Sequence, residues 1–408
     1  MISHMTTILT LDNGMRVAVA PQPGNVTYCG IFIDAGSRDE PSSLPGLAHF
    51  VEHTIFKGTS HRSSWHISNR MESVGGELNA YTTKESTCVY ITGPAGYEER
   101  EIELLADLVA NATFPSHEID KEREVIVEEI NSYLDNPTER VFDEFEDLFF
   151  AGSSLAHNIL GTPRSVREIA GADCRSFLQS HYSPGRMVGY IAGPVNPERV
   201  SRLLRKHWGR FDRPTHHSGR TAPAQVKPFE IVRDNGGHQA HTILGFPMFP
   251  RTDSRRFPLM LLNNYLGGPC MNSRLNQQLR DKRGLVYTVD SYVSLLSDTG
   301  MMSIYFGSDP KTVKKCVRLI RQEIDALLQN TISDRKLDRI KEQYCGQLLI
   351  GSDNKEAMAL SLPKNLMYFN RLTDIRELAA RLREVSPAEL REVAELLAPA
   401  FSSQLTLM

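Results

Sequence analysis

The order of apolar and polar positions predicts both strands and helices along the first half of the chain. Alternating apolar residues, or runs rich in Val, Ile, Thr and Tyr, are typical of strands. They lie at residues 8–11, 15–20 and 28–35, and as a strand pair at 78–91. Apolar residues three and four positions apart are typical of helices. They lie at residues 47–56, 66–74, 97–113 and 116–134.

Short turn signals separate these segments. Asp12-Asn13-Gly14 lies between the first two strands and is a strong hairpin signal. Pro45-Gly46 interrupts the chain just before the first helix, and Gly75-Gly76 follows the second one. We therefore expect a hairpin at the start of the chain and short, well-defined helices after it.

The second half of the chain repeats this order of elements. Helices are predicted at residues 257–266, 272–282, 310–329 and 333–349, and strands at 285–293 and 301–307. The strands at 88–92 and 301–306 occupy equivalent places, roughly 210 residues apart. An offset of this length indicates a duplicated domain and not a solenoid of short repeats.

The length and the duplication together predict the domain organisation. A chain of 408 residues suits two or more domains. Residues 213–228 are rich in Pro, Ser, Thr and Gly, which is a linker composition. We expect an α+β protein with two homologous domains, residues 1–212 and 229–408, joined by that linker. Each domain is expected to be a mostly antiparallel sheet with helices packed on one face.

Composition and charge narrow the class of protein. Apolar residues make up 40% and charged residues 23%, as in globular proteins, and the formal charge of −3 predicts neither nucleic acid nor an anionic membrane as partner. No apolar run is long enough to span a bilayer, and no signal-peptide pattern opens the sequence. The cysteines form no Cys-x-x-Cys pair, so we expect reduced, mostly buried thiols in a cytoplasmic protein and no structural zinc cluster. They are Cys29, Cys88, Cys174, Cys270, Cys316 and Cys345.

The first predicted helix carries a pattern suited to a metal ion. His49, Glu52 and His53 fall within an arc of about 100° on a helix of 3.6 residues per turn. Two imidazoles four residues apart reach one ion from adjacent turns, and zinc accepts such nitrogens. Glu52 between them is placed to take a proton from a zinc-bound water. The pattern His-x-x-Glu-His reverses the commoner order of zinc proteases.

A catalytic zinc usually has a third protein ligand. In the helix at 116–134, Glu129 shares a face with Glu122, Val125, Ile126 and Tyr133. Glu128 lies with the charged residues on the other face. Because a carboxylate on a buried face needs a cation or a proton, Glu129 is the better candidate ligand. Glu122 is placed to hydrogen-bond a ligand histidine and fix its orientation.

Plainer explanations of these residues remain open at this point. His49 and His53 also fit a core helix with two satisfied histidines. Glu129 also fits an ordinary helix carboxylate paired with an arginine. Several other histidines have no ligand spacing and are interpreted as structural. They are His61, His66, His117, His157, His181, His238 and His241.

Several separated motifs, in the same order, resemble the pitrilysin/insulinase family of zinc metallopeptidases, the inverzincins. The resemblance covers nearly the whole chain and is closest to the mitochondrial processing peptidases and the bacterial enzymes similar to them. The motifs are Leu11-Asp-Asn-Gly-Met-Arg-Val17, Gly46-Leu-Ala-His-Phe-Val-Glu-His-Thr-Ile-Phe-Lys-Gly-Thr59, Gly75-Gly-Glu-Leu-Asn-Ala-Tyr-Thr-Thr83, the stretch 122–129, Met271-Asn-Ser-Arg-Leu275 and Leu279-Arg-Asp-Lys-Arg-Gly-Leu-Val-Tyr287.

The resemblance implies roles for individual residues. Glu129 matches the distal zinc ligand of the family, and Glu122 matches a carboxylate near the site. Asn79 and Ala80 match a strand that pairs with the substrate backbone. Arg280 and Tyr287 match a pair thought to bind substrate near the scissile carbonyl. Taken alone, Arg280 would be interpreted as a surface ion pair and Tyr287 as a core strand residue.

The expected function is that of a zinc-dependent endopeptidase with one Zn²⁺ per chain, acting on unfolded or extended peptides. In the family the chamber is built from four related domains, so two such chains imply a dimer, with a homodimer favoured. Arg280 and Tyr287 of one subunit would then serve the zinc site of the other. The alternatives are a catalytically inactive homologue that binds peptides or assembles complexes, and a zinc enzyme acting on a small substrate.

Overall fold

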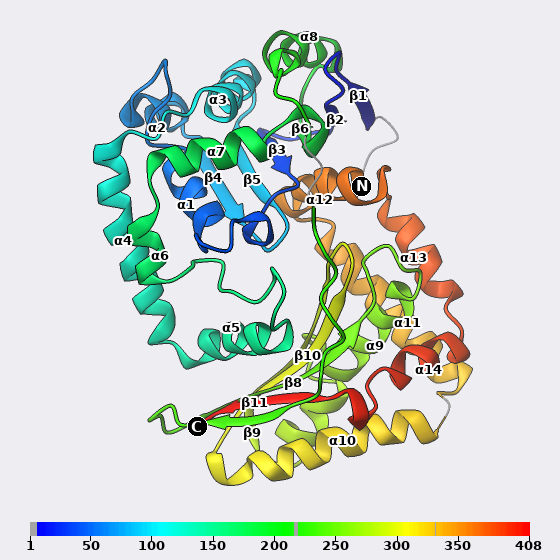
Figure 1. Ribbon diagram of the computed structural model, residues 1–408. Helices are drawn as coiled ribbons and strands as arrows, with labels where there is room; N and C mark the ends of the chain where they lie inside the picture. Colours follow the sequence, from blue (N-terminus) through cyan, green and yellow to red (C-terminus); the bar gives the residue numbers. More distant parts are fainter. Residues whose placement is uncertain (1–5, 216–218, 331) are drawn as a thin grey trace. The chain divides into compact units, whose positions relative to one another are not determined.

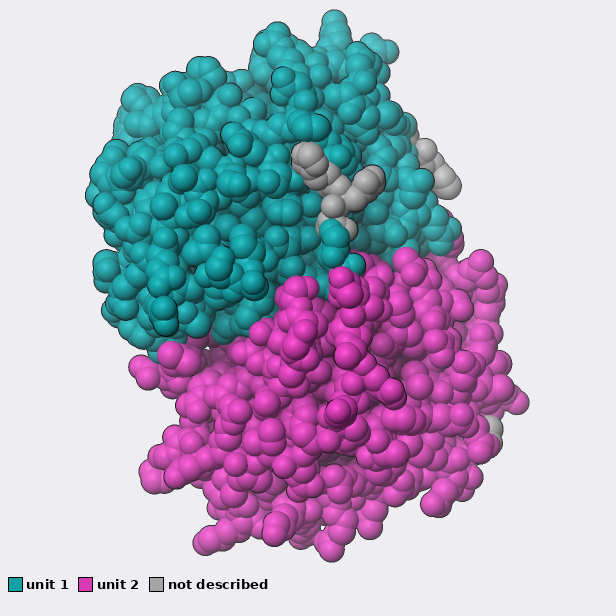
Figure 2. All heavy atoms as spheres, in the orientation of Figure 1, with its two compact units in different colours: residues 1–131, 157–220, 352–374 teal, residues 132–156, 221–351, 375–408 magenta. Residues whose placement is uncertain are grey.

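The computed structural model describes residues 6–215, 219–330 and 332–408 (Figure 1). The chain forms two compact units (Figure 2). The first unit consists of Met1–Asn131, His157–Arg220 and Ser352–Asp374. The second consists of Ser132–Ala156, Thr221–Gly351 and Ile375–Met408.

The first unit contains a six-stranded sheet in the order β1-β2-β6-β3-β5-β4. All neighbours are antiparallel except β2 and β6, which run parallel. The predicted hairpin is formed by β1 and β2, and Gly14 between them has a φ of 84°. The central strand β6 consists of seven buried residues, because the sheet is covered on both faces. The strands are β1 (Thr7–Thr10), β2 (Arg16–Pro21), β3 (Val26–Ile33), β4 (Glu77–Thr82), β5 (Thr87–Pro94) and β6 (Met187–Gly193).

The second unit contains a five-stranded sheet in the order β7-β11-β8-β10-β9. Its only parallel pair among the described residues is β7 with β11. This order reproduces β2-β6-β3-β5-β4 of the first sheet, with β10 in the place of β5, as the duplication predicted. The strands are β7 (Glu230–Arg233), β8 (Ala240–Met248), β9 (Val286–Leu295), β10 (Gly300–Ser308) and β11 (Ser403–Leu407).

Most helices of the first unit pack on one face of its sheet, where apolar residues such as Ile31, Val89 and Ile191 meet Phe50 and Leu105 in one core. Figure 1 shows α1, α3 and α7 on this side. The predicted helix at 116–134 agrees with α4. The helices of the first half are α1 (Leu47–Thr54), α2 (Ser64–Glu72), α3 (Glu98–Asn111), α4 (Ser116–Leu134), α5 (Pro137–Phe149), α6 (Pro163–Glu168), α7 (Gly171–His181) and α8 (Pro197–His207).

The second unit has a matching core, in which Leu262 and Leu266 of α9 pack with strand residues such as Leu244 and Ile304. The helix predicted at 272–282 is shorter: the chain becomes helical at Arg274 and forms a π-helix at Asn276–Asp281. The backbone N–H of Leu285 bonds to the carbonyl of Leu279 and draws the chain into β9. The helices are α9 (Arg256–Gly267), α10 (Val313–Gln329), α11 (Asp334–Gly351), α12 (Lys355–Phe369), α13 (Ile375–Glu384) and α14 (Pro387–Glu395).

Two helices cover the sheet of the other half of the sequence. α12 packs on the face of the first sheet that bears Phe32, Val188 and Tyr190. α5 packs on β8 and β11 of the second sheet, with Phe145 against their apolar residues. The α+β class and the principal layer of helices are as predicted. The additional helix on each second face follows from strands that are apolar on both sides. The predicted domains, 1–212 and 229–408, follow the sequence duplication. The compact units differ from them, because the segment with α5 belongs to the second unit and the segment with α12 belongs to the first.

The segment predicted as a linker contains no helix or strand in its described residues. Its first part is attached to the first unit. Arg213 donates to three backbone carbonyls, and Arg220 forms ion pairs with Asp34 and Asp39. The division into units comes directly after Arg220. The first part of the segment is therefore held by polar and charged contacts, whereas Val226 near its end packs against an apolar cluster of the second unit.

The cysteines agree with the expectation of unpaired, mostly buried thiols. All six cysteines are free; five are buried and Cys270 is half-buried. Among the residues that the structure describes, no helix is both long and apolar enough to cross a membrane.

Candidate metal centre

The start of α1 is fixed by Gly46 and by a buried carboxylate. Gly46 has a φ of 94°, and a Cβ there would lie 2.6 Å from the carbonyl oxygen of Leu160, so only glycine fits. Glu40 accepts the backbone N–H groups of Gly46 at 2.8 Å and Ala48 at 2.7 Å. A carboxylate is stabilised at this end of a helix. His157, which is 117 residues from Glu40 in the sequence, bonds to its carboxylate at 3.1 Å and completes the anchor.

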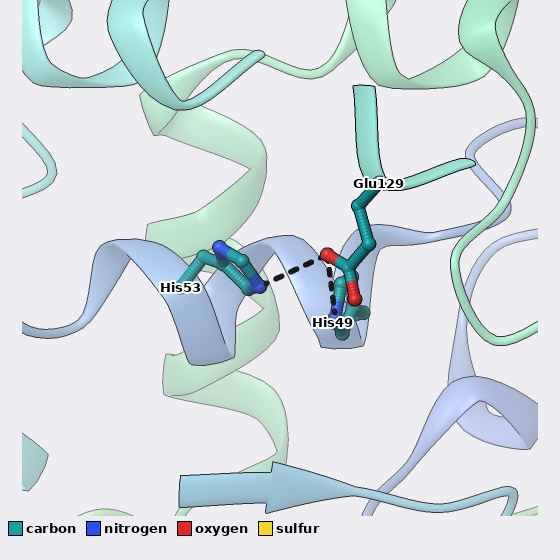
Figure 3. A group of neighbouring side chains, drawn as sticks. All are labelled: His49, His53 and Glu129. Atoms are coloured by element: carbon teal, nitrogen blue, oxygen red, sulfur yellow. Dashed lines mark ion pairs between the residues drawn. The ribbon is translucent and has the colours of Figure 1, made fainter. Parts of the chain in front are cut away.

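Three side chains from two helices converge beside α1 (Figure 3). His49 and His53 lie one turn apart on α1, with ring centroids 4.5 Å apart. Glu129 comes from α4, and its Oε2 lies 3.8 Å from Nε2 of His49 and 3.5 Å from Nε2 of His53. Their donor atoms all lie within 4.8 Å of one another. The structure thus brings together the three residues that the sequence suggested as ligands.

The two histidines have different electrostatic environments. Burial, together with the charge of His53, lowers the pKa of His49 to about 3, so its ring is neutral at pH 7. Burial also opposes protonation of His53. The hydrogen bond with Glu122 and the negative charge of Glu129 outweigh that effect, and the pKa of His53 is raised. A metal ion binds the same nitrogens that protons compete for, so both rings are suitable ligands once deprotonated.

Glu129 and its neighbour Glu128 differ as the helical wheel predicted. Glu128 is exposed, whereas Glu129 faces the histidines with 34% of its side chain exposed. The wheel was wrong about two companions of Glu129. Val125 is 51% exposed and Tyr133 lies at the surface, because α4 packs through Ile119, Ile126 and Ile130 and leaves the edge of that face open. Glu129 therefore lies at the rim of the core and not inside it.

Glu52 lies on α1 between the two histidines in sequence and is partly buried. Burial raises its pKa and the charge of Glu129 adds to the rise, while a hydrogen bond with Thr82 and the charge of His53 oppose it. Thr82 is the last residue of β4, which packs beside α1. A carboxyl group whose pKa is raised toward neutrality is suited to accept and return a proton.

Glu122 lies where the sequence placed it, beside a ligand histidine. Its Oε2 is 3.3 Å from Nδ1 of His53, and its Oε1 is 2.6 Å from Nζ of Lys57. Sequence reasoning missed Lys57 and Thr82. Lys57 follows His53 by four residues, and that helical spacing was the available signal. Thr82 offered none, because its contact with Glu52 depends on how β4 packs.

Asn79 and Ala80 lie on β4, the terminal strand of the first sheet. The far edge of β4 has no partner strand among the described residues. Asn79 is exposed and Ala80 is half-buried. A strand edge of this kind has unpaired backbone groups that a second extended chain can use.

Arg280 and Tyr287 belong to the second unit, where they lie on adjoining elements. Arg280 is exposed near the end of the π-helix, and no described residue forms an ion pair with it. Tyr287 lies on β9 with 60% of its surface exposed. Neither of the plainer interpretations, a surface ion pair for Arg280 and a core position for Tyr287, agrees with this arrangement.

The donor set of the first unit fits a zinc ion. Tetrahedral zinc with bonds of about 2.0–2.1 Å places two ligand atoms roughly 3.4 Å apart. The separations of Glu129 Oε2 from the two histidine nitrogens are 3.5 and 3.8 Å, close to that value. Two imidazoles and one carboxylate also leave one coordination position for water or substrate. Among the described residues, this is the group of three such side chains that meets the spacing of a metal site.

Sequence comparison assigns the two halves of the chain to related models. Residues 16–163 match the insulinase family, peptidase family M16, and residues 169–344 match the peptidase M16 inactive domain. The metal group lies within the first match. The second match begins in the first unit with α7, β6 and α8, and continues in the second unit from β7 into α11.

Similar proteins extend over almost the whole chain. An uncharacterized zinc protease of Streptomyces coelicolor is 33% identical over 94% of this chain and 85% of its own length. The beta subunit of the mitochondrial-processing peptidase of Caenorhabditis elegans is 29% identical over 95% of this chain and 86% of its own. A protease from Helicobacter pylori has the same fold, with a TM-score of 0.91, 21% identity and 99% of both chains covered. The chain is therefore a member of the insulinase family of peptidases, family M16.

Proposed function

We propose that this protein is a zinc-dependent endopeptidase that hydrolyses unfolded or extended peptides. The observation that carries the proposal is the convergence of His49, His53 and Glu129 within 4.8 Å, with Glu52 on the same helix. Membership of a peptidase family and the zinc proteases among its relatives support it. Each chain would hold one Zn²⁺.

Each residue around the metal would have its own role in hydrolysis. A bound zinc ion supplies a Lewis acid, which polarises the scissile carbonyl and makes a water molecule more acidic. Glu52 accepts the proton of the attacking water and delivers it to the leaving amine. Its raised pKa suits both steps, because the group must be a base first and an acid afterwards. Glu122 orients His53 through Nδ1, as outer carboxylates do for ligand histidines.

The substrate in this proposal lies extended beside β4. Backbone groups of residues near Asn79 and Ala80 would pair with it as an added strand. Thr82 on the same strand bonds to Glu52, so a peptide on this edge passes close to the catalytic base. Pairing along a strand edge requires a peptide with a free backbone, which favours unfolded substrates over small molecules.

The proposal includes a homodimer in the cytoplasm. Arg280 and Tyr287 are exposed on the second unit and available to a partner chain. In the dimer they would serve the zinc site of the other subunit, with Tyr287 stabilising the oxyanion of the transition state. Six free cysteines suit a reducing compartment.

Replacement of Glu52 by Gln tests the function. The change preserves size and removes the base, so hydrolysis of a quenched-fluorescence peptide library should fall by about 10²–10⁴-fold. Zinc content, measured by mass spectrometry, should stay at the wild-type level. Wild-type protein that binds zinc but cleaves no peptide at a rate above Glu52→Gln would instead be a non-catalytic homologue that binds peptides or assembles complexes.

A further inference from the structure

The ligand histidine His53 is connected to a lysine through a carboxylate, whereas His49 has no such connection among the described residues. Nδ1 of His53 is 3.3 Å from Oε2 of Glu122, and the second oxygen of that carboxylate is 2.6 Å from Nζ of Lys57. These contacts form a continuous line from Lys57 through Glu122 to His53. Nδ1 of His49 is buried and has no hydrogen-bond partner among the described residues. The orientation of His49 is therefore set by packing, whereas that of His53 is set by polar contacts.

The backbone fixes Lys57 in this place. The N–H of Lys57 bonds to the carbonyl of Thr54 in the turn that ends α1. The next residues are held by the bond from Thr113 to the carbonyl of Gly58 and by the bridge between Thr59 and Ala112. The ammonium group thus points at Glu122 from a braced turn and not from a mobile loop.

The ion pair between Lys57 and Glu122 matters because Glu122 is largely buried. The Glu122 side chain is only 10% exposed, against 27% for Lys57. A carboxylate that is so far removed from water needs cationic partners. Lys57 occupies Oε1, which leaves Oε2 directed at the ring of His53. Without the ammonium group, Glu122 would be free to turn away from Nδ1.

We propose that Lys57 is a positioning residue for the metal centre, acting through Glu122 to hold the ring of His53 toward the ion. This inference rests on the proposed zinc site. Lys57 contacts neither substrate nor metal in this account. Removing its charge should weaken metal binding even though every ligand remains.

The variants Lys57→Met and Lys57→Gln test the role with a direct metal readout. Lys57 borders a surface cavity of about 830 Å³, so a neutral side chain has room there. Zinc affinity, measured by chelator competition on the full-length protein, should fall by about 10–100-fold in either variant, as for other outer partners of ligands. Lys121→Met is the matched control, because it removes an exposed lysine paired with Glu118 on the same helix as Glu122. That variant should bind zinc like the wild type.

A double-variant cycle distinguishes positioning from a general structural effect. Glu122→Gln alone should weaken zinc binding at least as much as Lys57→Met. Adding Lys57→Met to Glu122→Gln should cause no further loss, because the lysine acts through that carboxylate. Lys57→Arg keeps the charge and should recover part of the affinity. Thermal unfolding of the metal-free proteins verifies that each variant is folded.

Two outcomes overturn the inference. Zinc affinity equal to wild type in both neutral variants would show that Lys57 does not support His53. An equal loss from Lys57→Met in the wild-type and Glu122→Gln backgrounds would show that it acts by another route. Either result leaves the proposed function intact if the wild type binds zinc and Glu52→Gln abolishes hydrolysis. Wild-type protein without bound zinc would overturn both.

Discussion

The two units have the same sheet topology but differ in the chemistry of the helix that follows the central antiparallel strand. The order β2-β6-β3-β5-β4 of the first unit is repeated as β7-β11-β8-β10-β9 in the second. In the first unit α1 presents His49, Glu52 and His53 among its apolar residues. The corresponding α9 has Leu259, Leu262 and Leu266 buried in the core and no histidine or carboxylate.

The difference teaches that fold and chemistry are specified separately in this chain. The apolar pattern of the strands and helices suffices to build either unit. The metal group is an addition to one of them, made from few polar residues and their supporting carboxylates. The predictions below test whether the second unit contributes chemistry as well as packing.

The largest expected effect concerns Tyr287, which would give the second unit a catalytic role. Tyr287→Phe removes one oxyanion donor and should lower activity by about 10²–10³-fold. Mixed with Glu52→Gln, it should regain activity well above either variant alone, because each mixed dimer combines an intact zinc site with an intact tyrosine. The measurement is peptide hydrolysis after subunit exchange.

The control for this experiment lies on the same strand. Tyr292→Phe changes another exposed tyrosine of β9 and should keep wild-type activity. If differently tagged subunits exchange freely and the mixture of Tyr287→Phe with Glu52→Gln stays inactive, the cross-subunit arrangement is wrong.

A smaller effect is expected from the packing role of α9. Leu262 is fully buried, so Leu262→Ala should lower the free energy of unfolding by about 2–5 kcal/mol. Zinc content of the folded protein should be unchanged, because the metal group belongs to the first unit. Ile350→Ala is the control, since Ile350 is 77% exposed, and it should change stability by no more than about 0.5 kcal/mol. Denaturant titration measures both; loss of zinc from folded Leu262→Ala would contradict the separation.

The smallest effect is a pH dependence in the first unit. Burial raises the pKa of Glu101 to about 7; a hydrogen bond from Thr27 opposes the rise, and the charge of Glu98 adds to it. The pKa of Glu101 is higher in the folded protein than in the unfolded chain. The contribution of the protonated Glu101 carboxyl group to stability is therefore fully present below about pH 4.5 and is lost as the pH rises through 7. Glu101→Gln should therefore stabilise the metal-free protein at about pH 8.5, by on the order of 2 kcal/mol, but much less at about pH 5.

Thermal unfolding at the two pH values measures this difference. Glu99 is exposed in the same turn of the helix, so it provides the control. The effect of Glu99→Gln on stability should not depend on pH. A Glu101→Gln protein whose stability relative to wild type is the same at both pH values would mean that the carboxyl group does not titrate between them.

The sequence predicted the local elements and the two histidines of the metal group because these depend on short-range spacing. The helix at 116–134 and the hairpin around Gly14 follow from periodicity and turn residues. His49 and His53 follow from one helical turn, and the preference for Glu129 over Glu128 follows from the helical wheel.

Contacts between distant segments were beyond reach of that reasoning. Periodicity identifies an amphipathic helix but not its partner, so the packing of α5 and α12 on the sheets of the other halves could not be foreseen. The same limit hid the contact of His157 with Glu40, which are 117 residues apart in the sequence.

The most direct test of the metal centre compares two adjacent carboxylates of α4. Zinc per chain should be measured by mass spectrometry after dialysis for the wild type, Glu129→Gln and Glu128→Gln. Our account predicts about one zinc ion in the wild type and in Glu128→Gln, and a large loss in Glu129→Gln, because only Glu129 reaches the histidines. Full zinc content in Glu129→Gln would contradict the proposed centre.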